Sequence, residues 1–100
     1  MTIKHVVAWK LASEDPAERA EHAAGVIERL QGLLGLIPEI QELSVGANSL
    51  DYPGNWDLVL VSEFADAAAL DTYQQHPEHQ KVGAYVRSVV SERAAVDYEL

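Results

Sequence analysis

Cysteine is absent from the 100 residues of this chain, which excludes disulfide bonds, thiolate metal ligands and a cysteine nucleophile. Basic residues are few: 7 lysines and arginines stand against 16 aspartates and glutamates, and the formal net charge is -9. Such acidity argues against partners that are nucleic acids or anionic membrane surfaces. No apolar run is long enough to span a bilayer, and no signal-peptide pattern opens the sequence. We therefore expect a cytoplasmic protein.

Sequence motifs for cofactors are also missing. The chain has no glycine-rich loop for phosphates and no strand–turn–helix motif for a serine nucleophile. His76 and His79, with Glu78 between them, have a spacing that suits two metal ligands, but Pro77 takes His76 off the helix and no third ligand is obvious. We expect neither a metal nor a cofactor.

What the chain does contain is a regular order of strand and helix patterns. Apolar residues make up 48% of the sequence, enough for one packed domain over residues 1–100. Alternation predicts strands, and capping residues with helical spacing predict helices. The expected elements are a strand at 3–11, a helix from Pro16 to about Leu34, strands near 42–46 and 56–64, two helices between Asp66 and about Val90 that meet at Pro77, and a strand at 93–99.

This order predicts an α+β, ferredoxin-like fold (β-α-β-β-α-β), in which helices cover one face of a four-stranded antiparallel sheet. In the first helix, the spacing predicts a buried stripe of Ala20, Ala23, Ala24, Ile27, Leu30 and Leu34. His22 is expected on the solvent side of that helix, and Gly35 is expected as its C-terminal cap.

The uncovered face of the predicted sheet is unusually apolar. Val6, Ala8, Val59 and Val61 alternate with the residues that face the helices and would form a patch there. Soluble domains seldom expose such a patch, and a second copy related by a two-fold axis is the simplest cover. We therefore predict a homodimer whose two sheets face each other.

The stretch from Tyr73 to Gln80 (Tyr-Gln-Gln-His-Pro-Glu-His-Gln) concentrates reactive side chains. Pro77 suits the first position of a helix, and the residue before a proline avoids helical geometry. One helix should therefore end near Gln75 and another begin at Pro77, with His76 at the elbow. The structural alternative is a polar corner, with Tyr73 in the core and the histidines in water.

Several segments together resemble the stress-responsive dimeric α/β-barrel family (the Dabb domain). They are Ile3-Lys4-His5-Val6-Val7, Ile37-Pro38, Asp57-Leu58-Val59-Leu60-Val61, the elbow from Tyr73 to His79, and Asp97-Tyr98. The resemblance covers nearly the whole chain and implies a ferredoxin-like fold in a dimeric barrel. Members of that family include a plant cyclase that forms olivetolic acid by aldol condensation, a fern hydroxynitrile lyase and a plant oligomer without known catalysis.

In the cyclase the working groups are a histidine and a tyrosine of the elbow motif, with a first-strand histidine in the pocket. The resemblance places these roles on His79, Tyr73 and His5. The cyclase has aromatic side chains along its first helix, where this chain has Val26, Ile27 and Leu30. A pocket of different shape, and hence a different substrate, is implied.

The residues themselves are compatible with that chemistry. A neutral imidazole can remove a proton next to a carbonyl, and a tyrosine hydroxyl can hydrogen-bond the developing enolate oxygen. The expected catalytic residues are His79 as base, Tyr73 as donor and His5 beside them. The expected pocket-lining residues are Val7, Trp9, Val26, Ile27, Leu30, Trp56 and Val82.

Two functions stay open from the sequence. The first is a cofactor-independent cyclase or lyase that acts on a small apolar or aromatic carbonyl compound. The second is a dimer without catalysis, either a ligand-binding or a stress-response protein; an oxygenase is a weaker third. In the second case His5 would be a buried histidine bonded to a backbone carbonyl, and Tyr73 a core aromatic.

Overall fold

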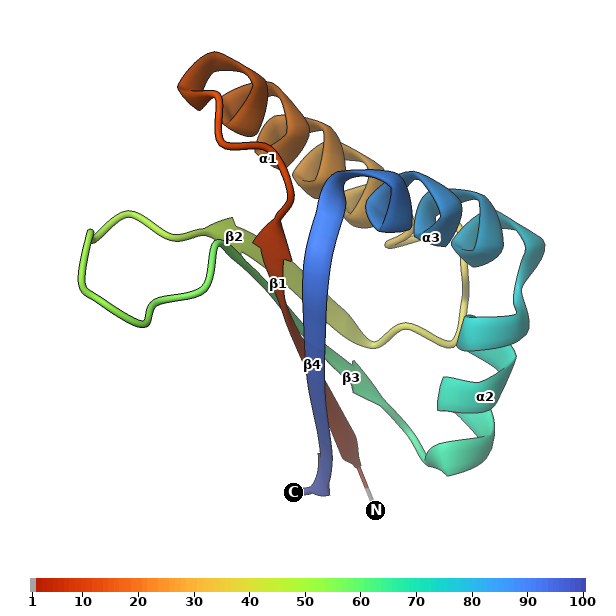
Figure 1. Cartoon of the computed structure of the whole chain (residues 1–100). Helices are drawn as coiled ribbons and strands as arrows, with labels where there is room; N and C mark the ends of the chain where they lie inside the picture. The colour runs from red at the N-terminus through yellow and green to blue at the C-terminus, as the bar shows by residue number, and fades with distance from the viewer. Residues whose placement is uncertain (1) are drawn as a thin grey trace.

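The computed structural model describes residues 2–100 and shows a four-stranded sheet with helices on one face (Figure 1). The elements are β1 (Ile3–Leu11), α1 (Pro16–Gln31), β2 (Glu42–Ala47), β3 (Leu58–Phe64), α2 (Ala67–Gln75), α3 (Pro77–Val89) and β4 (Val90–Glu99). All neighbouring strands are antiparallel, in the order β2-β3-β1-β4. The ferredoxin-like α+β fold expected from the sequence is confirmed.

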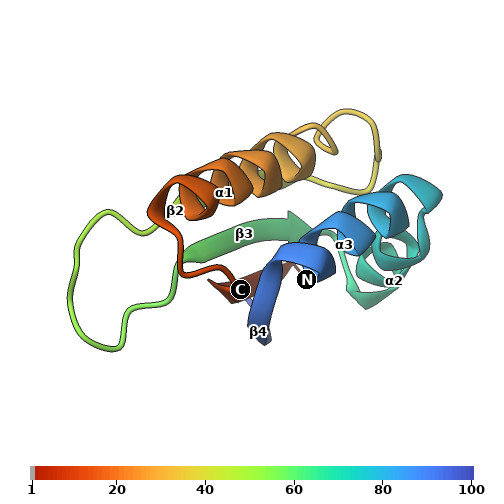
Figure 2. The same ribbon diagram turned by 45° about the horizontal axis from the view of Figure 1, so that its top comes forward.

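The helices cover one face of the sheet (Figure 2), and the core side chains lie between the two layers. β1 alternates strictly, so that every second residue from Ile3 to Leu11 is buried under the helices. β3 contributes Leu58, Leu60 and Phe64, each at most 2% exposed. Burial of each such side chain contributes about 1.5–3 kcal/mol, so this layer supplies most of the driving force for folding.

The two predicted caps and the predicted elbow are present. The carboxylate of Asp15 accepts a hydrogen bond from the Glu18 N–H at 2.9 Å, and that of Asp66 accepts one from the Ala69 N–H at 2.8 Å. His76 has extended backbone angles, ends α2 and caps α3. The elbow thereby turns the chain so that residues on both sides of it approach the same part of the sheet.

The first helix differs from its prediction in length and in its buried side. α1 ends at Gln31, and Gly35, with φ +85°, belongs to the turns that follow. Glycine weakens a helix, and Gly32 stands where this one ends. The turns after α1 bury Leu33 and Ile37. Leu34, which was predicted to belong to the buried stripe of the helix, is 49% exposed instead.

The buried side of α1 is correspondingly centred on Val26 and Leu30, with Ala23 and Ile27 packed against the core. Ala20 and Ala24 are exposed, contrary to the prediction. His22 is half-buried rather than on the solvent side, and its Nδ1 is shielded from solvent without a hydrogen-bond partner among the described residues.

The last two strands begin at positions other than those predicted. β3 starts at Leu58, because the preceding residue Asp57 ties the loop to β1 and α1: its N–H donates to the Trp9 carbonyl, and its carboxylate accepts from the Leu11 N–H and from Arg19. β4 starts at Val90, directly after α3.

No helix within residues 2–100 combines the length and the apolar character that a membrane crossing requires.

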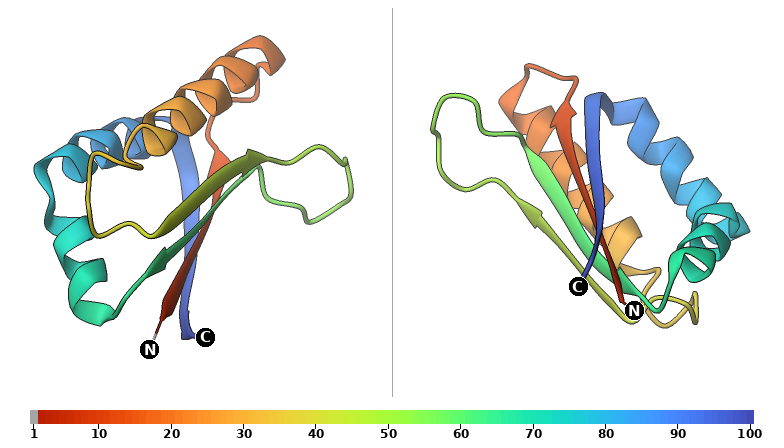
Figure 3. Two further views of the ribbon diagram at one scale, coloured as in Figure 1. Left: turned by 180° about the vertical axis from the view of Figure 1, so that it is seen from behind. Right: turned by 90° about the horizontal axis from the view of Figure 1, so that it is seen from below.

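In the part of the chain that the structure describes, no helix lies on the opposite face of the sheet (Figure 3). Its apolar side chains include Val59, Val96 and Tyr98, which are 39%, 62% and 45% exposed. The Lys4–Glu63 pair (3.3 Å) and the Lys10–Glu92 pair (3.1 Å) lie at the two ends of this patch. We call this surface the open face.

Candidate functional site

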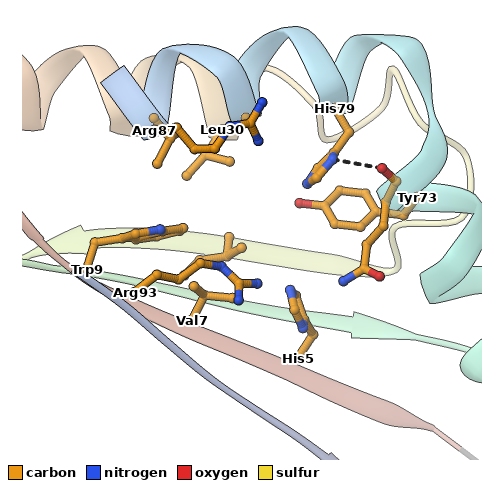
Figure 4. A pocket seen from close by; sticks show the side chains of 12 residues that line it. His5, Val7, Trp9, Leu30, Tyr73, His79, Arg87 and Arg93 are labelled. Atoms are coloured by element: carbon orange, nitrogen blue, oxygen red, sulfur yellow. Dashed lines mark hydrogen bonds between the residues drawn. The ribbon is translucent and has the colours of Figure 1, made fainter. Parts of the chain in front are cut away.

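A cavity of about 260 Å³ lies between the helix-covered face of the sheet and α3 (Figure 4). An engineered apolar cavity of about 150 Å³ holds one benzene molecule. By that measure this cavity holds about ten non-hydrogen atoms, which is one substituted ring. The lining residues are His5, Val7, Trp9, Leu30, Leu60, Tyr73, Gln74, His79, Gly83, Val86, Arg87 and Arg93.

Tyr73 reaches the cavity from the buried side of α2. The residue is fully buried, and its ring packs on Phe64 with centroids 4.9 Å apart. Its hydroxyl is buried and has no hydrogen-bond partner among the described residues. Burial raises the pKa of Tyr73 to about 12, although the Arg93 charge acts to lower it. The side chain is therefore a neutral donor whose hydrogen bond is available to a molecule in the cavity.

His79 lies on the first turn of α3, beside Tyr73. The two ring centroids are 4.4 Å apart. Nδ1 of His79 is 3.2 Å from the Gln74 carbonyl oxygen, an acceptor, so Nδ1 carries the proton and Nε2 has the free lone pair. Burial is the main cause that lowers the pKa of His79, and the charges of His5, Arg87 and Arg93 act in the same direction against the backbone hydrogen bond. The result is a neutral imidazole with its basic nitrogen available.

His5 approaches the same space from β1. Its side chain is buried, and its Nδ1 is hydrogen-bonded to the carboxylate of Asp97 on the neighbouring strand. A carboxylate acceptor fixes the proton on Nδ1 and leaves Nε2 on the far side of the ring. The His5 and Tyr73 rings meet edge to face at 6.4 Å. The partner of His5 is therefore a carboxylate, not the backbone carbonyl considered from the sequence.

The structure brings together the three expected catalytic residues, but only some of the expected lining. Val7, Trp9 and Leu30 line the cavity with His5, Tyr73 and His79. Val26 does not, because it is completely buried in the core beneath α1. Ile27 and Val82 pack against that core instead of facing the cavity.

Trp56 is misplaced in the prediction. It precedes β3 and so does not follow the alternation of that strand. The residue borders a separate hollow with Ala8, Gly46 and Val59, and Lys10 Nζ lies 4.9 Å from its ring centroid. Trp56 is therefore on the side of the open face and cannot line the cavity.

Four lining or supporting residues were not anticipated as parts of the site: Gln74, Arg87, Arg93 and Asp97. A signal for two of them is present in the sequence, because the alternation of residues 93–99 places Arg93 and Asp97 on the same face of β4. The missing information was the strand register. Trp9 pairs with Arg93 and His5 pairs with Asp97, which sets both side chains toward the helices.

Residues for a metal are not assembled in the part of the chain that the structure describes. No group of three histidine, aspartate or glutamate side chains is placed to hold an ion within residues 2–100. Nδ1 of His76 accepts a hydrogen bond from the Glu78 N–H at 3.1 Å, so this histidine caps α3. The chemistry that the cavity supports is proton transfer and hydrogen bonding by His79, Tyr73 and His5.

Comparison with known proteins agrees with the fold. The sequence profile described as "Stress responsive A/B Barrel Domain" matches residues 3–100. No curated protein matches the chain in sequence. A dimeric protein of unknown function and ferredoxin-like fold from Bacteroides fragilis is 33% identical, with a TM-score of 0.88, over 99% of this chain and 96% of that chain.

Two further solved structures extend the comparison. A dimeric ferredoxin-like protein of unknown function from Thermobifida fusca is 27% identical, with a TM-score of 0.85, over 100% of this chain and 92% of that one. The hydroxynitrile lyase from Passiflora edulis is 15% identical, with a TM-score of 0.79, over 97% of this chain and 91% of that one. The likeness to the lyase concerns the fold alone.

Proposed function

Because this chain belongs to the family of the stress-responsive A/B barrel domain, we propose that its cavity binds a small aromatic or apolar carbonyl compound and catalyses cofactor-independent cyclase or lyase chemistry. One observation carries the proposal: the buried hydroxyl of Tyr73 has no partner in the described residues and lies on the cavity wall beside a neutral imidazole. A buried donor without a partner costs about 1–3 kcal/mol. A carbonyl oxygen in the cavity would satisfy it.

In the proposed reaction the substrate carbonyl accepts a hydrogen bond from the Tyr73 hydroxyl. Nε2 of His79 removes a proton from the carbon next to that carbonyl, and the electron pair of the C–H bond moves into the enolate. His79 becomes an imidazolium, and the Tyr73 hydroxyl stabilises the negative oxygen. In a cyclase the enolate carbon then attacks a second carbonyl of the same molecule, and the imidazolium returns its proton to the new alkoxide.

His5 acts as a positioning residue in this scheme. Asp97 holds its ring orientation, and the ring packs edge to face against both Phe64 and Tyr73. Substitution of His5 would thus loosen the wall that fixes the Tyr73 ring. A wall that restrains the donor is needed, because catalysis falls steeply when a donor is misplaced by about 1 Å.

Hydrogen–deuterium exchange at the methyl group of acetophenone tests the proposed base chemistry. This compound has about nine non-hydrogen atoms, which is within the cavity's capacity of about ten. NMR in D₂O follows loss of the methyl signal. We expect wild-type protein to accelerate the exchange, His79→Gln to lose about 10²–10⁴-fold of that acceleration, and Tyr73→Phe about 10²–10³-fold. The matched control is Tyr52→Phe, which removes a hydroxyl from a loop residue that is 65% exposed and should leave the rate unchanged.

The same samples separate catalysis from binding. If acetophenone binds wild-type protein, as saturation-transfer NMR would show, but exchanges no faster than with free imidazole at equal concentration, the protein is a ligand-binding member of the family. If it neither binds nor exchanges, the carbonyl-compound proposal is wrong.

We propose further that the chain assembles as a homodimer through the open face. Two solved relatives, from Bacteroides fragilis and Thermobifida fusca, are described as dimeric. The support within this chain is the exposure of Val59, Val96 and Tyr98 on one surface, with an ion pair at each end. An apolar centre between polar ends is the usual composition of a protein–protein interface.

A further inference from the structure

The basic residues of this acidic chain are distributed in an informative way. Only seven side chains are lysine or arginine. Lys4, Lys10, Arg19 and Lys81 each form an ion pair with a carboxylate. Arg29 stacks on the ring of Tyr85, with 3.7 Å between its guanidinium carbon and the ring centroid.

The remaining two, Arg87 and Arg93, form no ion pair within residues 2–100, and both line the cavity. None of the twelve lining residues is an aspartate or a glutamate. The Asp97 carboxylate is hydrogen-bonded to the lining residue His5, so two guanidinium groups and one carboxylate leave an excess of one positive charge at this cavity. In a chain with 16 acidic and 7 basic residues, that local excess is the opposite of the overall balance. This local charge selects for a negative ligand.

The two arginines come from different walls. Arg87 is near the end of α3, and Arg93 is near the start of β4, so they flank the junction of the two elements. Figure 4 shows Arg87 on the helix side and Arg93 on the sheet side, with the space between them continuous with the space beside Tyr73 and His79. An anionic group held between the two guanidinium groups would leave the rest of the ligand next to the apolar lining and the Tyr73 hydroxyl.

Gly83 contributes to the placement of Arg87. A Cβ atom at Gly83 would lie 3.2 Å from Nη1 of Arg87, which is tighter than most such contacts, so the guanidinium would have to shift slightly. Both residues line the cavity. The absence of a side chain at position 83 therefore lets the Arg87 guanidinium lie back along α3, over the cavity.

We infer that the ligand of this cavity is an organic acid: a single-ring or similarly small carbonyl compound whose carboxylate binds between Arg87 and Arg93. A planar guanidinium matches the two oxygens of a carboxylate. The apolar portion contacts Val7, Trp9 and Leu30. This inference rests on the proposed function, because it names the substrate class of the same cavity. A bound carboxylate also offsets the repulsion that both arginines exert on a protonated His79.

Benzoate and benzamide test the inference, because they have the same shape and number of non-hydrogen atoms and differ in charge. Isothermal titration calorimetry of the full chain should give a benzoate affinity at least about tenfold above that of benzamide. Arg87→Gln and Arg93→Gln should each weaken benzoate by about tenfold or more and benzamide by less than about twofold. Lys81→Gln makes the same charge change on α3 at an exposed position outside the cavity, and should change neither.

Each other outcome overturns the inference. If benzamide binds wild-type protein as well as benzoate does, the carboxylate is not recognised, while the proposal of a carbonyl-binding cavity stands. If Arg87→Gln and Arg93→Gln affect benzoate no more than Lys81→Gln does, the arginines are not the anion site. If phenylphosphonate binds about tenfold more tightly than benzoate, the ligand is a phosphoryl compound and not a carboxylate. If neither benzoate nor benzamide binds although acetophenone does, the inference is wrong and the proposed function stands. If none of the three compounds binds, both are wrong.

Discussion

The two faces of the sheet are built from the same strands and both have apolar centres, yet their surroundings differ. On β3, Leu58 and Leu60 face the helices and are 2% exposed, whereas Val59, between them, is 39% exposed on the open face. The face under the helices holds the core and the cavity with its titratable groups. The open face has ion pairs at its ends. We therefore propose ligand chemistry for the first face and assembly for the second.

The largest expected effect comes from a charge placed on the covered face. Leu58→Glu would bury a carboxylate among apolar side chains without a partner, and we expect a loss of more than about 4 kcal/mol in the free energy of unfolding. Circular dichroism during urea titration measures this loss. A Leu58→Glu protein as stable as wild type would contradict the placement of the core.

The neighbouring residue provides the matched variant on the other face. Val59→Glu should leave the chain folded, because the side chain is 39% exposed in a single copy. It should convert the proposed dimer to a monomer, because an unpaired carboxylate is unfavourable in an apolar interface. Light scattering coupled to size-exclusion chromatography gives the mass. An unchanged dimer of Val59→Glu would move the interface away from the open face, and a monomeric wild type would remove it.

Tyr73, on the covered face, should make the free energy of unfolding depend on pH in the alkaline range. Its pKa is raised from 10.0 to about 12 in the folded chain, so the unfolded state loses the proton first. The corresponding stabilisation is complete below pH 10 and is lost as the pH rises toward 12, a loss of about 3 kcal/mol. Urea titrations should show this loss in wild type and not in Tyr73→Phe. The Tyr52→Phe control, in an exposed loop, should follow wild type; equal alkaline losses in wild type and Tyr73→Phe would contradict the burial of this hydroxyl.

His79 gives a smaller effect with the opposite sign. Its folded-state pKa lies below the ordinary histidine value of about 6.5, mainly because of burial. The unfolded state therefore takes up the proton first as the pH falls, and stability is retained above pH 6.5 and declines below it. His79→Gln should reduce this acid-side decline. We expect a smaller change than for Tyr73, because His79 is only partly buried. A proton titration of His79 by NMR with a midpoint above 6.5 would contradict this prediction.

Sequence patterns predicted those parts of the structure that depend on local rules. The alternation of β1, the Asp15 and Asp66 caps and the Pro77 elbow each follow from a few neighbouring residues, and they placed His5, Tyr73 and His79 near one another. The end of α1 was wrong because the burial of Leu33 and Ile37 is a tertiary effect that helix spacing does not show. Trp56 was wrong because the Asp57 contacts, which hold that loop, reach residues far away in the chain.

The cationic part of the site could not be predicted for a related reason. Arg87 and Arg93 belong to different elements, and an arginine on a helix or a strand is usually a solvated side chain. Only the pairing of β4 with β1 and the packing of α3 on the sheet bring the two guanidinium groups to the same cavity. Arg87 and Arg93 also stand out as a candidate anion site because other basic side chains are paired with carboxylates. The sequence does not reveal those ion pairs.

The most direct test of the proposed function is a crystal structure of the protein with acetophenone. We expect density for the ring in the cavity between Trp9 and Leu30 and the ketone oxygen about 2.5–3.0 Å from the Tyr73 hydroxyl oxygen. Acetophenone found only outside this cavity, with the Tyr73 hydroxyl still without a partner, would contradict the assignment of the covered face as the ligand site.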